Sequence, residues 1–136
     1  MSYFSREDVV EEFHRAFGHP VGVKGSSDII VLRNRLIEEE YDELKDELAS
    51  AMVDLDTKGQ ISPKTKARIL KELADLQYVI SGLAVSLGLP LQVAFIRVHK
   101  SNMSKLGEDG RPVYREDGKI LKSNLYVPPD LEDLVE

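Results

Sequence analysis

The chain has 136 residues, of which 42% are hydrophobic and 31% charged, and this composition suits one globular domain. Its net charge of −6 argues against nucleic-acid binding, because a basic surface supplies most of the affinity for nucleic acids. The lack of cysteine excludes disulfides and thiolate metal sites. The first residues open no signal peptide and no apolar stretch reaches the length of a membrane span, so we expect a cytoplasmic protein without a membrane partner.

Two helices are expected in the first half of the chain. The first begins after Ser5, which has an acidic residue at capping-box spacing, and apolar residues then recur at helical spacing up to Gly18. After a turn-rich connection, a second helix is expected from about Ile29 to Val53, with a break at residues 56–59.

Two further helices are expected in the second half. Ser62-Pro63 is a strong start, because a capping residue is followed by proline at the first helical position, and this helix continues to Leu87. A fourth helix is expected from Pro90 to roughly residue 105. Four helices joined by short connections predict an all-α, four-helix-bundle-like domain over residues 1–106.

Residues 107–136 differ in character from the helical part. Two Asp-Gly turn signals, at residues 109–110 and 117–118, indicate turns, and a small hairpin is expected with Val113-Tyr114 and Ile120-Leu121 as its strands. We expect this short tail to pack on the same domain, over the bundle or over a partner subunit.

Acidic residues lie on the helix faces that should meet the core. At about 100° per residue, Glu40 and Glu43 fall in the same sector of the second helix as its leucines. Glu72 lies at the centre of the apolar stripe of the third helix, and Asp75 follows on the same face. Solvated acids would lie opposite the leucines. Unpaired carboxylates in a core cost roughly several kcal/mol each, so these four need partners.

Two kinds of partner are open. The first is a buried ion-pair network, to which Arg33, Arg35, Arg68 and Lys71 could contribute. The second is a divalent cation between the helices, since two carboxylates one turn apart on each of two helices can converge on an ion. The region holds no cysteine or histidine, so its ligands are all oxygen, which favours Mg²⁺ or Mn²⁺ over zinc, copper or a di-iron centre.

The spacing of these acids resembles that of a known superfamily. Glu40-x-x-Glu43 followed by Glu72-x-x-Asp75 resembles the E-x2-E…E-x2-D signature of the all-α nucleotide pyrophosphohydrolases, which include MazG, the dimeric dUTPases and phosphoribosyl-ATP pyrophosphohydrolase. Residues 98–105 look like the phosphate-side helix of that superfamily, and residues 13–18 look like the first helix of a MazG-like subgroup. The resemblance implies a MazG-type fold that assembles as a homodimer or a dimer of dimers.

The resemblance also implies roles for individual residues. Mg²⁺, with Mn²⁺ as a substitute, would be held by the motif residues Glu40, Glu43, Glu72 and Asp75. The family reaction is attack on the α-phosphorus of a nucleoside triphosphate, with release of pyrophosphate. Glu39 is the candidate general base, and a further or outer metal ligand is the alternative for it. Glu47 falls outside the motif and is expected near the site or at the surface.

Substrate contacts are expected from the later part of the chain. Asn102 and Lys105 lie one turn apart and could reach ribose or phosphate, although a lysine at a helix end also complements the helix dipole. Lys119 and Lys122 could close over the phosphates from the tail. His14 and His99 are expected to be packing residues without a role in the chemistry.

Three functions remain open at this point. The resemblance favours a house-cleaning hydrolase of (deoxy)nucleoside triphosphates, with dUTP as a possible preferred substrate. Hydrolysis of phosphoribosyl-ATP in histidine biosynthesis would use the same metal site. A non-catalytic helical interaction module, whose acids form ion pairs, is the alternative from another class. The preferred base and sugar, the number of metal ions and the choice between dimer and tetramer are left open.

Overall fold

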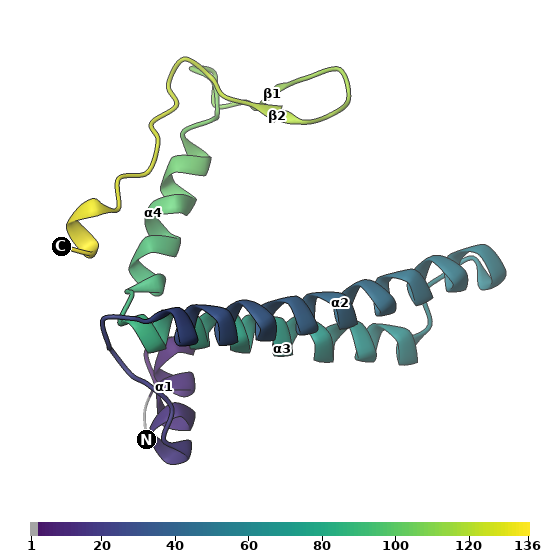
Figure 1. The fold of residues 1–136 in the computed structure, drawn as a ribbon. Coiled ribbons are helices and arrows are strands. Elements are labelled where there is room, and N and C mark those ends of the chain that lie inside the picture. The colour runs from purple at the N-terminus through teal and green to yellow at the C-terminus, as the bar shows by residue number, and fades with distance from the viewer. Residues whose placement is uncertain (1–2) are drawn as a thin grey trace. The chain divides into compact units, whose positions relative to one another are not determined.

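The computed structural model describes residues 3–136, and its regular secondary structure is almost entirely helical (Figure 1). This confirms the predicted all-α class. The helices, two short strands and one 3-10 helix are, in chain order, α1 (Arg6–Phe17), α2 (Ser27–Lys58), α3 (Pro63–Leu87), α4 (Leu91–Met103), β1 (Val113–Tyr114), β2 (Ile120–Leu121) and η1 (Glu132–Leu134).

Serine caps define where the first three helices begin. The hydroxyls of Ser5, Ser26 and Ser62 each accept a hydrogen bond from the backbone N–H three residues later, which satisfies one of the free donors of a helix N-terminus. Each of these helices ends at a glycine in the left-handed conformation, and Gly88 with a φ of 67° ends α3 as the sequence predicts.

Helix α2 is longer than the sequence indicates. The prediction that it stops near Val53 before a break at residues 56–59 is wrong, because the helix continues to Lys58. Thr57 stays in the helix and its hydroxyl donates to Val53 O at 2.8 Å. Only Gly59, with a φ of 74°, leaves the helical conformation, since it alone in this stretch adopts that backbone at no steric cost.

The chain divides into two compact units, one ending at Gly88 and the other comprising Leu89–Glu136. In the first unit α2 and α3 lie side by side as an antiparallel pair, and α1 packs against α3 (Figure 1). The fully buried apolar residues of this unit are few and mostly small: Val10, Leu44, Ala51, Ala84 and Val85.

The second unit consists of α4 and the tail. Its hairpin pairs β1 with β2 in antiparallel register, with Val113 opposite Leu121, and this confirms the predicted strands. The tail is fastened to α4, because Arg97 donates to both carboxylate oxygens of Asp133 and Ser101 Oγ donates to Val127 O at 2.7 Å. The predicted boundary after residue 106 therefore falls inside this unit. Packing of the tail on α1–α3 stays a prediction.

No single helix among residues 3–136 has both the length and the apolar composition of a membrane span, and only α3 and α4 taken together reach them.

Candidate metal centre

Helices α2 and α3 bring four carboxylates to one place. Glu40 and Glu43 come from α2, and Glu72 and Asp75 come from α3. One oxygen of each lies within 4.8 Å of the others. The apolar residues around these acids hold the two helices side by side. Because the acids lie on the same core-facing sides as those apolar residues, they converge between the helices.

Two oxygens of the cluster are buried and unpaired. Within the described part of the chain, Glu40 Oε2 and Glu72 Oε2 are inaccessible to solvent and have no hydrogen-bond partner. Nearly all buried polar atoms in folded proteins are hydrogen-bonded, and an unpaired one costs free energy. These two oxygens are therefore candidate metal ligands, because a bound cation would give each of them the partner that it lacks.

The surroundings of Glu40 and Glu72 make the charged state of these two carboxyl groups unfavourable. Burial raises the pKa of Glu40, and the charges of Glu43, Asp75 and Glu72 raise it further. Burial also raises the pKa of Glu72, as does the neighbouring carboxyl group of Glu43, while the Lys71 ammonium opposes this. A divalent cation would reverse the effect, because it stabilises the ionised form of every carboxylate around it.

One lysine partly compensates the cluster. Lys71 Nζ lies 2.6 Å from Asp75 Oδ2 and 3.6 Å from Glu72 Oε1, and the hydrogen bond to Asp75 raises the pKa of Lys71. The lysine side chain is 65% exposed, so this ion pair contributes little stability. One ammonium does not balance four carboxylates.

The arginines considered as ion-pair partners lie elsewhere. Arg68 Nε donates to Glu47 Oε2 at 2.8 Å, which accounts for Glu47 outside the cluster. Arg35 is exposed, and Arg33 is buried two turns before Glu40 without an ion pair to any carboxylate of residues 3–136. Of these four cations only Lys71 pairs with the cluster in the described part of the chain, and it does so from an exposed position, so these residues form no buried ion-pair network.

The other predicted site residues lie outside the cluster of four. Glu39 is exposed on α2, next to the ligand Glu40. Asn102, Lys105, Lys119 and Lys122 all belong to the second unit. Lys105 is half-buried and the other three are exposed, and Lys122 Nζ lies 4.8 Å from the centre of the Tyr126 ring. The roles of these five residues stay predictions.

The two histidines that the sequence predicts as packing residues, His14 and His99, differ from each other. His14 is 2% exposed, as expected of a packing residue, and its Nδ1 lies 2.9 Å from Pro20 O. His99 is exposed on α4, so it does not pack in a core. The sequence alone could not separate them, because both lie beside apolar residues on a helix.

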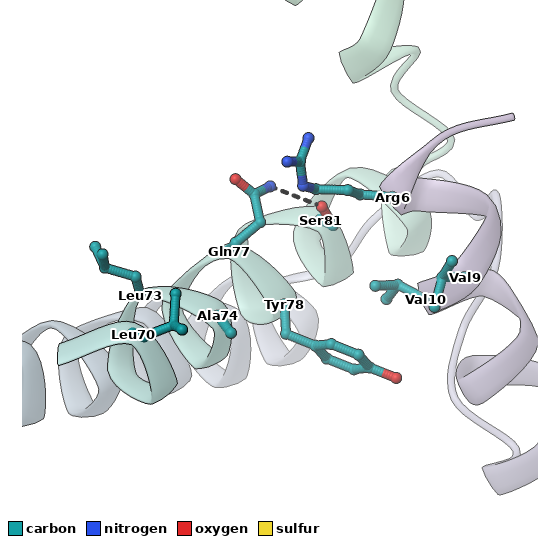
Figure 2. A pocket seen from close by; sticks show the side chains of 9 residues that line it. All are labelled: Arg6, Val9, Val10, Leu70, Leu73, Ala74, Gln77, Tyr78 and Ser81. Carbon is teal, nitrogen blue, oxygen red and sulfur yellow. Dashed lines mark hydrogen bonds between the residues drawn. The ribbon is translucent and has the colours of Figure 1, made fainter. Parts of the chain in front are cut away.

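A cavity of about 480 Å³ is lined by residues of α1 and α3 (Figure 2). Its walls are mainly apolar, and its polar end carries the hydrogen bond that Gln77 Nε2 donates to Ser81 Oγ (Figure 2). Ser81 Oγ in turn donates to Glu7 Oε2 at 2.5 Å. None of the four acids lines this cavity. The candidate metal centre and the cavity are therefore formed by different residues.

An all-α hairpin that carries paired acids on both helices defines the class of helical nucleotide pyrophosphohydrolases. The sequence model of one family in this class, phosphoribosyl-ATP pyrophosphohydrolase, matches residues 10–102. The chain belongs to that family, and it is therefore an enzyme of the pyrophosphohydrolase class. The matched range includes all four acids and Asn102, but it ends before Lys105.

Two further comparisons add context. A protein from Exiguobacterium sp. 255-15, provisionally described as an NTP pyrophosphohydrolase, has a crystal structure similar to this one, with a TM-score of 0.45 and 25% sequence identity over 94% of this chain and 90% of the other. A search among curated proteins found no significant match.

Proposed function

We propose that the protein is a Mg²⁺-dependent pyrophosphohydrolase that cleaves nucleoside triphosphates to monophosphates and pyrophosphate in the cytoplasm. The observation that carries this proposal is the convergence of four carboxylates, two of which keep buried oxygens without a hydrogen-bond partner. Family membership supplies the reaction class, and the convergence of the carboxylates supports our proposal that the reaction occurs beside them.

The donor set fits Mg²⁺, with Mn²⁺ as a substitute. All four candidate ligands, Glu40, Glu43, Glu72 and Asp75, are carboxylates, and hard divalent cations prefer oxygen. When bound, the ion would lower the pKa of water and offset negative charge on the phosphates and the leaving group. That offset is necessary, because a triphosphate would otherwise meet a cluster of like charge.

The chain's own residues would position the substrate and move the proton. Glu39, beside the ligand pair, would accept a proton from the water that attacks the α-phosphorus, and pyrophosphate would leave from the opposite side. Asn102, Lys105, Lys119 and Lys122 would contact ribose or phosphate, since amide and ammonium donors match those groups. We propose a homodimer or a dimer of dimers as the assembly.

Two substrate classes are consistent with this site. The resemblance to MazG-like and dimeric dUTPase sequences supports a house-cleaning hydrolase of (d)NTPs that prefers dUTP. The description of the matching family supports phosphoribosyl-ATP as the second candidate. Family membership argues against the alternative of a non-catalytic module, and so does the cluster, because its single lysine would leave most of the carboxylate charge without a partner.

The test is pyrophosphate release from a panel of (d)NTPs and phosphoribosyl-ATP, measured with Mg²⁺ and with a chelator. We expect Mg²⁺-dependent release from at least one (d)NTP, with dUTP ranked high. Release from phosphoribosyl-ATP alone would favour the second candidate. No release from any member by folded protein would contradict the proposal.

A further inference from the structure

One basic side chain lies at the rim of the four carboxylates. Lys71 Nζ is 2.6 Å from Asp75 Oδ2 and 3.6 Å from Glu72 Oε1. Within the described part of the chain, no other lysine, arginine or histidine forms an ion pair with any of the four acids. The unit that carries the acids therefore supplies one cation at their side, and this residue has no assigned role in the proposed reaction.

Glu72 is shared between the rim and the interior of the cluster. Its Oε1 lies beside Lys71, whereas its Oε2 is buried and has no hydrogen-bond partner. The lysine side chain is exposed, while the side chain of Glu72 is mostly buried. Lys71 thus leaves the buried oxygen of Glu72 to a metal ion and occupies only the side of the cluster that faces solvent.

Stability does not account for a lysine at this place. An ion pair with an exposed lysine contributes little to the free energy of folding. The helix dipole gives no reason for it either, because cations are stabilised near the C-terminus of a helix and Lys71 lies nearer the N-terminus of α3. These two considerations favour a functional role for the ammonium.

The partners of Lys71 are themselves proposed metal ligands. Once Asp75 and Glu72 share their negative charge with a divalent cation, they attract the ammonium less, and the cation itself repels it. The lysine is free to respond, because its side chain is exposed and carries its three donors on a flexible four-carbon stem. Metal binding therefore weakens the contact to Asp75 and makes the ammonium available to another anion.

The substrate brings that anion. Phosphate oxygens that approach the metal arrive at the solvent side of the cluster, where Lys71 lies, and an ammonium binds phosphate as a compact charge. We propose that Lys71 is a substrate-binding residue, which pairs with Asp75 in the free protein and donates to a phosphate oxygen once metal and nucleotide are bound. The inference rests on the proposed function, which places the metal and the phosphates at the acids. The substrate contacts predicted from the sequence all belong to the second unit, so Lys71 would add one from the unit that carries the acids.

The change of partner predicts opposite effects on metal and phosphate binding in Lys71→Met. Without nucleotide, the variant should bind Mn²⁺ about 3- to 10-fold more tightly, because a repelling charge is removed. With Mg²⁺ present, it should bind inorganic pyrophosphate about 10- to 100-fold more weakly, as for loss of a hydrogen bond between charged groups. Mn²⁺ binding is measured by electron paramagnetic resonance, and pyrophosphate binding is measured by calorimetry.

Two further variants control for the charge. Lys64→Met removes an exposed lysine on the same face of α3, two turns and about 10 Å before Lys71, and should change neither value by more than about twofold. Lys71→Arg keeps a positive donor and should retain pyrophosphate binding to within about threefold. In the steady state, Lys71→Met should raise KM for the most active triphosphate by more than it lowers kcat, since the ammonium contacts phosphate before and during the reaction.

Three results would overturn the inference. Unchanged pyrophosphate binding by Lys71→Met would show that the ammonium stays at Asp75. Weaker Mn²⁺ binding by the same variant would show that the lysine only positions Asp75 for the metal. Hydrolysis of triphosphates with a KM that is independent of Lys71 would leave the proposed function intact and overturn the inference alone.

The opposite combination separates the two proposals. If no triphosphate of the panel is hydrolysed but Mg²⁺-dependent binding of pyrophosphate is lost in Lys71→Met, the inference holds and the proposed function fails. If folded protein neither hydrolyses a triphosphate nor binds pyrophosphate with Mg²⁺, both are contradicted.

Discussion

The carboxyl groups of Glu40 and Glu72 lie where the folded protein alone does not provide partners for all of their oxygens. Each keeps one buried oxygen without a hydrogen bond, and burial raises the pKa of both carboxyl groups. The apolar residues on α2 and α3 fix the helices, so the acids cannot move apart without loss of packing. The free protein therefore stores an electrostatic cost at the place where a cation would relieve it.

That cost predicts how stability depends on pH. Because the pKa of Glu40 is raised above its ordinary value of 4.5, the folded state holds more protons than the unfolded state between 4.5 and the raised value. In the presence of a chelator, Tm should rise as the pH falls from 7 towards about 5. Mg²⁺ should raise Tm more at pH 7 than at pH 5, since it binds the ionised carboxylates.

Thermal unfolding at several pH values checks this prediction. Glu40→Gln should flatten the dependence, and Glu38→Gln, an exposed neighbour on the same helix, should leave it unchanged. A metal-free Tm that rises from pH 5 to pH 7 in parallel for all three proteins would contradict it.

Glu39 can be tested separately from the metal ligands. Glu39→Gln should lower kcat by about 100-fold or more, because it removes the proposed proton acceptor. It should leave the rise in Tm with Mg²⁺ intact, because Glu39 is outside the cluster of four. Loss of the Mg²⁺ effect in this variant would instead identify Glu39 as a metal ligand.

The sequence predicted part of the site and missed part of it. Glu40, Glu43, Glu72 and Asp75 could be grouped in advance, since helical phase alone puts them on core-facing sides. The burial of Arg33 could not be predicted, because it depends on how α1 packs against α3. The pairing of Lys71 with Asp75 depends on a flexible side chain, which sequence patterns do not determine.

At the level of elements, the turn between α2 and α3 is fixed by a buried aspartate. Asp54 Oδ2 accepts from Ser62 N at 3.0 Å, and Lys58 Nζ lies 3.4 Å from Oδ1. Hydrogen bonds from the Thr65 hydroxyl and from the Ser62 backbone hold the pKa of Asp54 well below its usual range. The aspartate thus ties the end of one helix to the cap of the next.

Substitution of Asp54 should therefore loosen this turn. Asp54→Asn should lower Tm by about 5 °C at pH 7, as expected for loss of a helix cap. Since the folded pKa is depressed, the contribution is present above the ordinary value of 3.8 and is lost as the pH falls further. Asp56→Asn, exposed in the last turn of α2, is the control and should leave Tm unchanged. Equal effects of the two substitutions would contradict this role.

Helix ends were predictable where caps determine them. Ser62-Pro63 and Gly88 bound α3 as expected, because a serine cap, a first-turn proline and a left-handed glycine are local signals. The predicted end of α2 near Val53 is too early, because only Gly59 of the predicted break at residues 56–59 ends the helix. Polar residues alone do not end a helix on a surface, and the glycine that follows them does.

At the level of the whole molecule, the first unit exposes many large apolar side chains and buries few of them. Few large apolar side chains of the first unit are buried, while Leu70 is 68% exposed and Met52 is 60% exposed. Leu70 and Leu73 also line the open cavity between α1 and α3 (Figure 2). A monomer rarely exposes such a surface, so we propose that a second copy of the chain covers it.

The mass in solution tests this assembly. Light scattering should give about 31 kDa, twice the 15.3 kDa of one chain, or a further doubling for a dimer of dimers. Leu70→Glu should shift the protein towards the monomer and lower Tm, because a charge cannot be buried there without a partner. Lys66→Glu, an exposed position on the same helix, should do neither. A folded wild-type monomer of 15.3 kDa would contradict the proposal.

The grouping of the helices into compact units was the least predictable feature of the fold. Four helices and a hairpin could be read from local signals, but α4 forms a unit with the tail instead of with α1–α3. Hydroxyl and guanidinium contacts of Ser101 and Arg97 determine this grouping, and no periodic pattern indicates them. Assembly likewise depends on exposed apolar residues that a sequence cannot distinguish from core.

The most direct test of the central claim is pyrophosphate release as a function of Mg²⁺ concentration in wild type, Glu72→Gln and Glu47→Gln, with the most active triphosphate of the panel. If the four carboxylates form the metal centre, wild-type release will saturate with Mg²⁺ and stop with chelator. Glu72→Gln will then be at least about 100-fold slower at every concentration while remaining folded. Glu47→Gln, which loses only its partner Arg68, will behave like wild type apart from a small loss of Tm. Full activity of Glu72→Gln, or wild-type release that is unaffected by chelator, would contradict the claim.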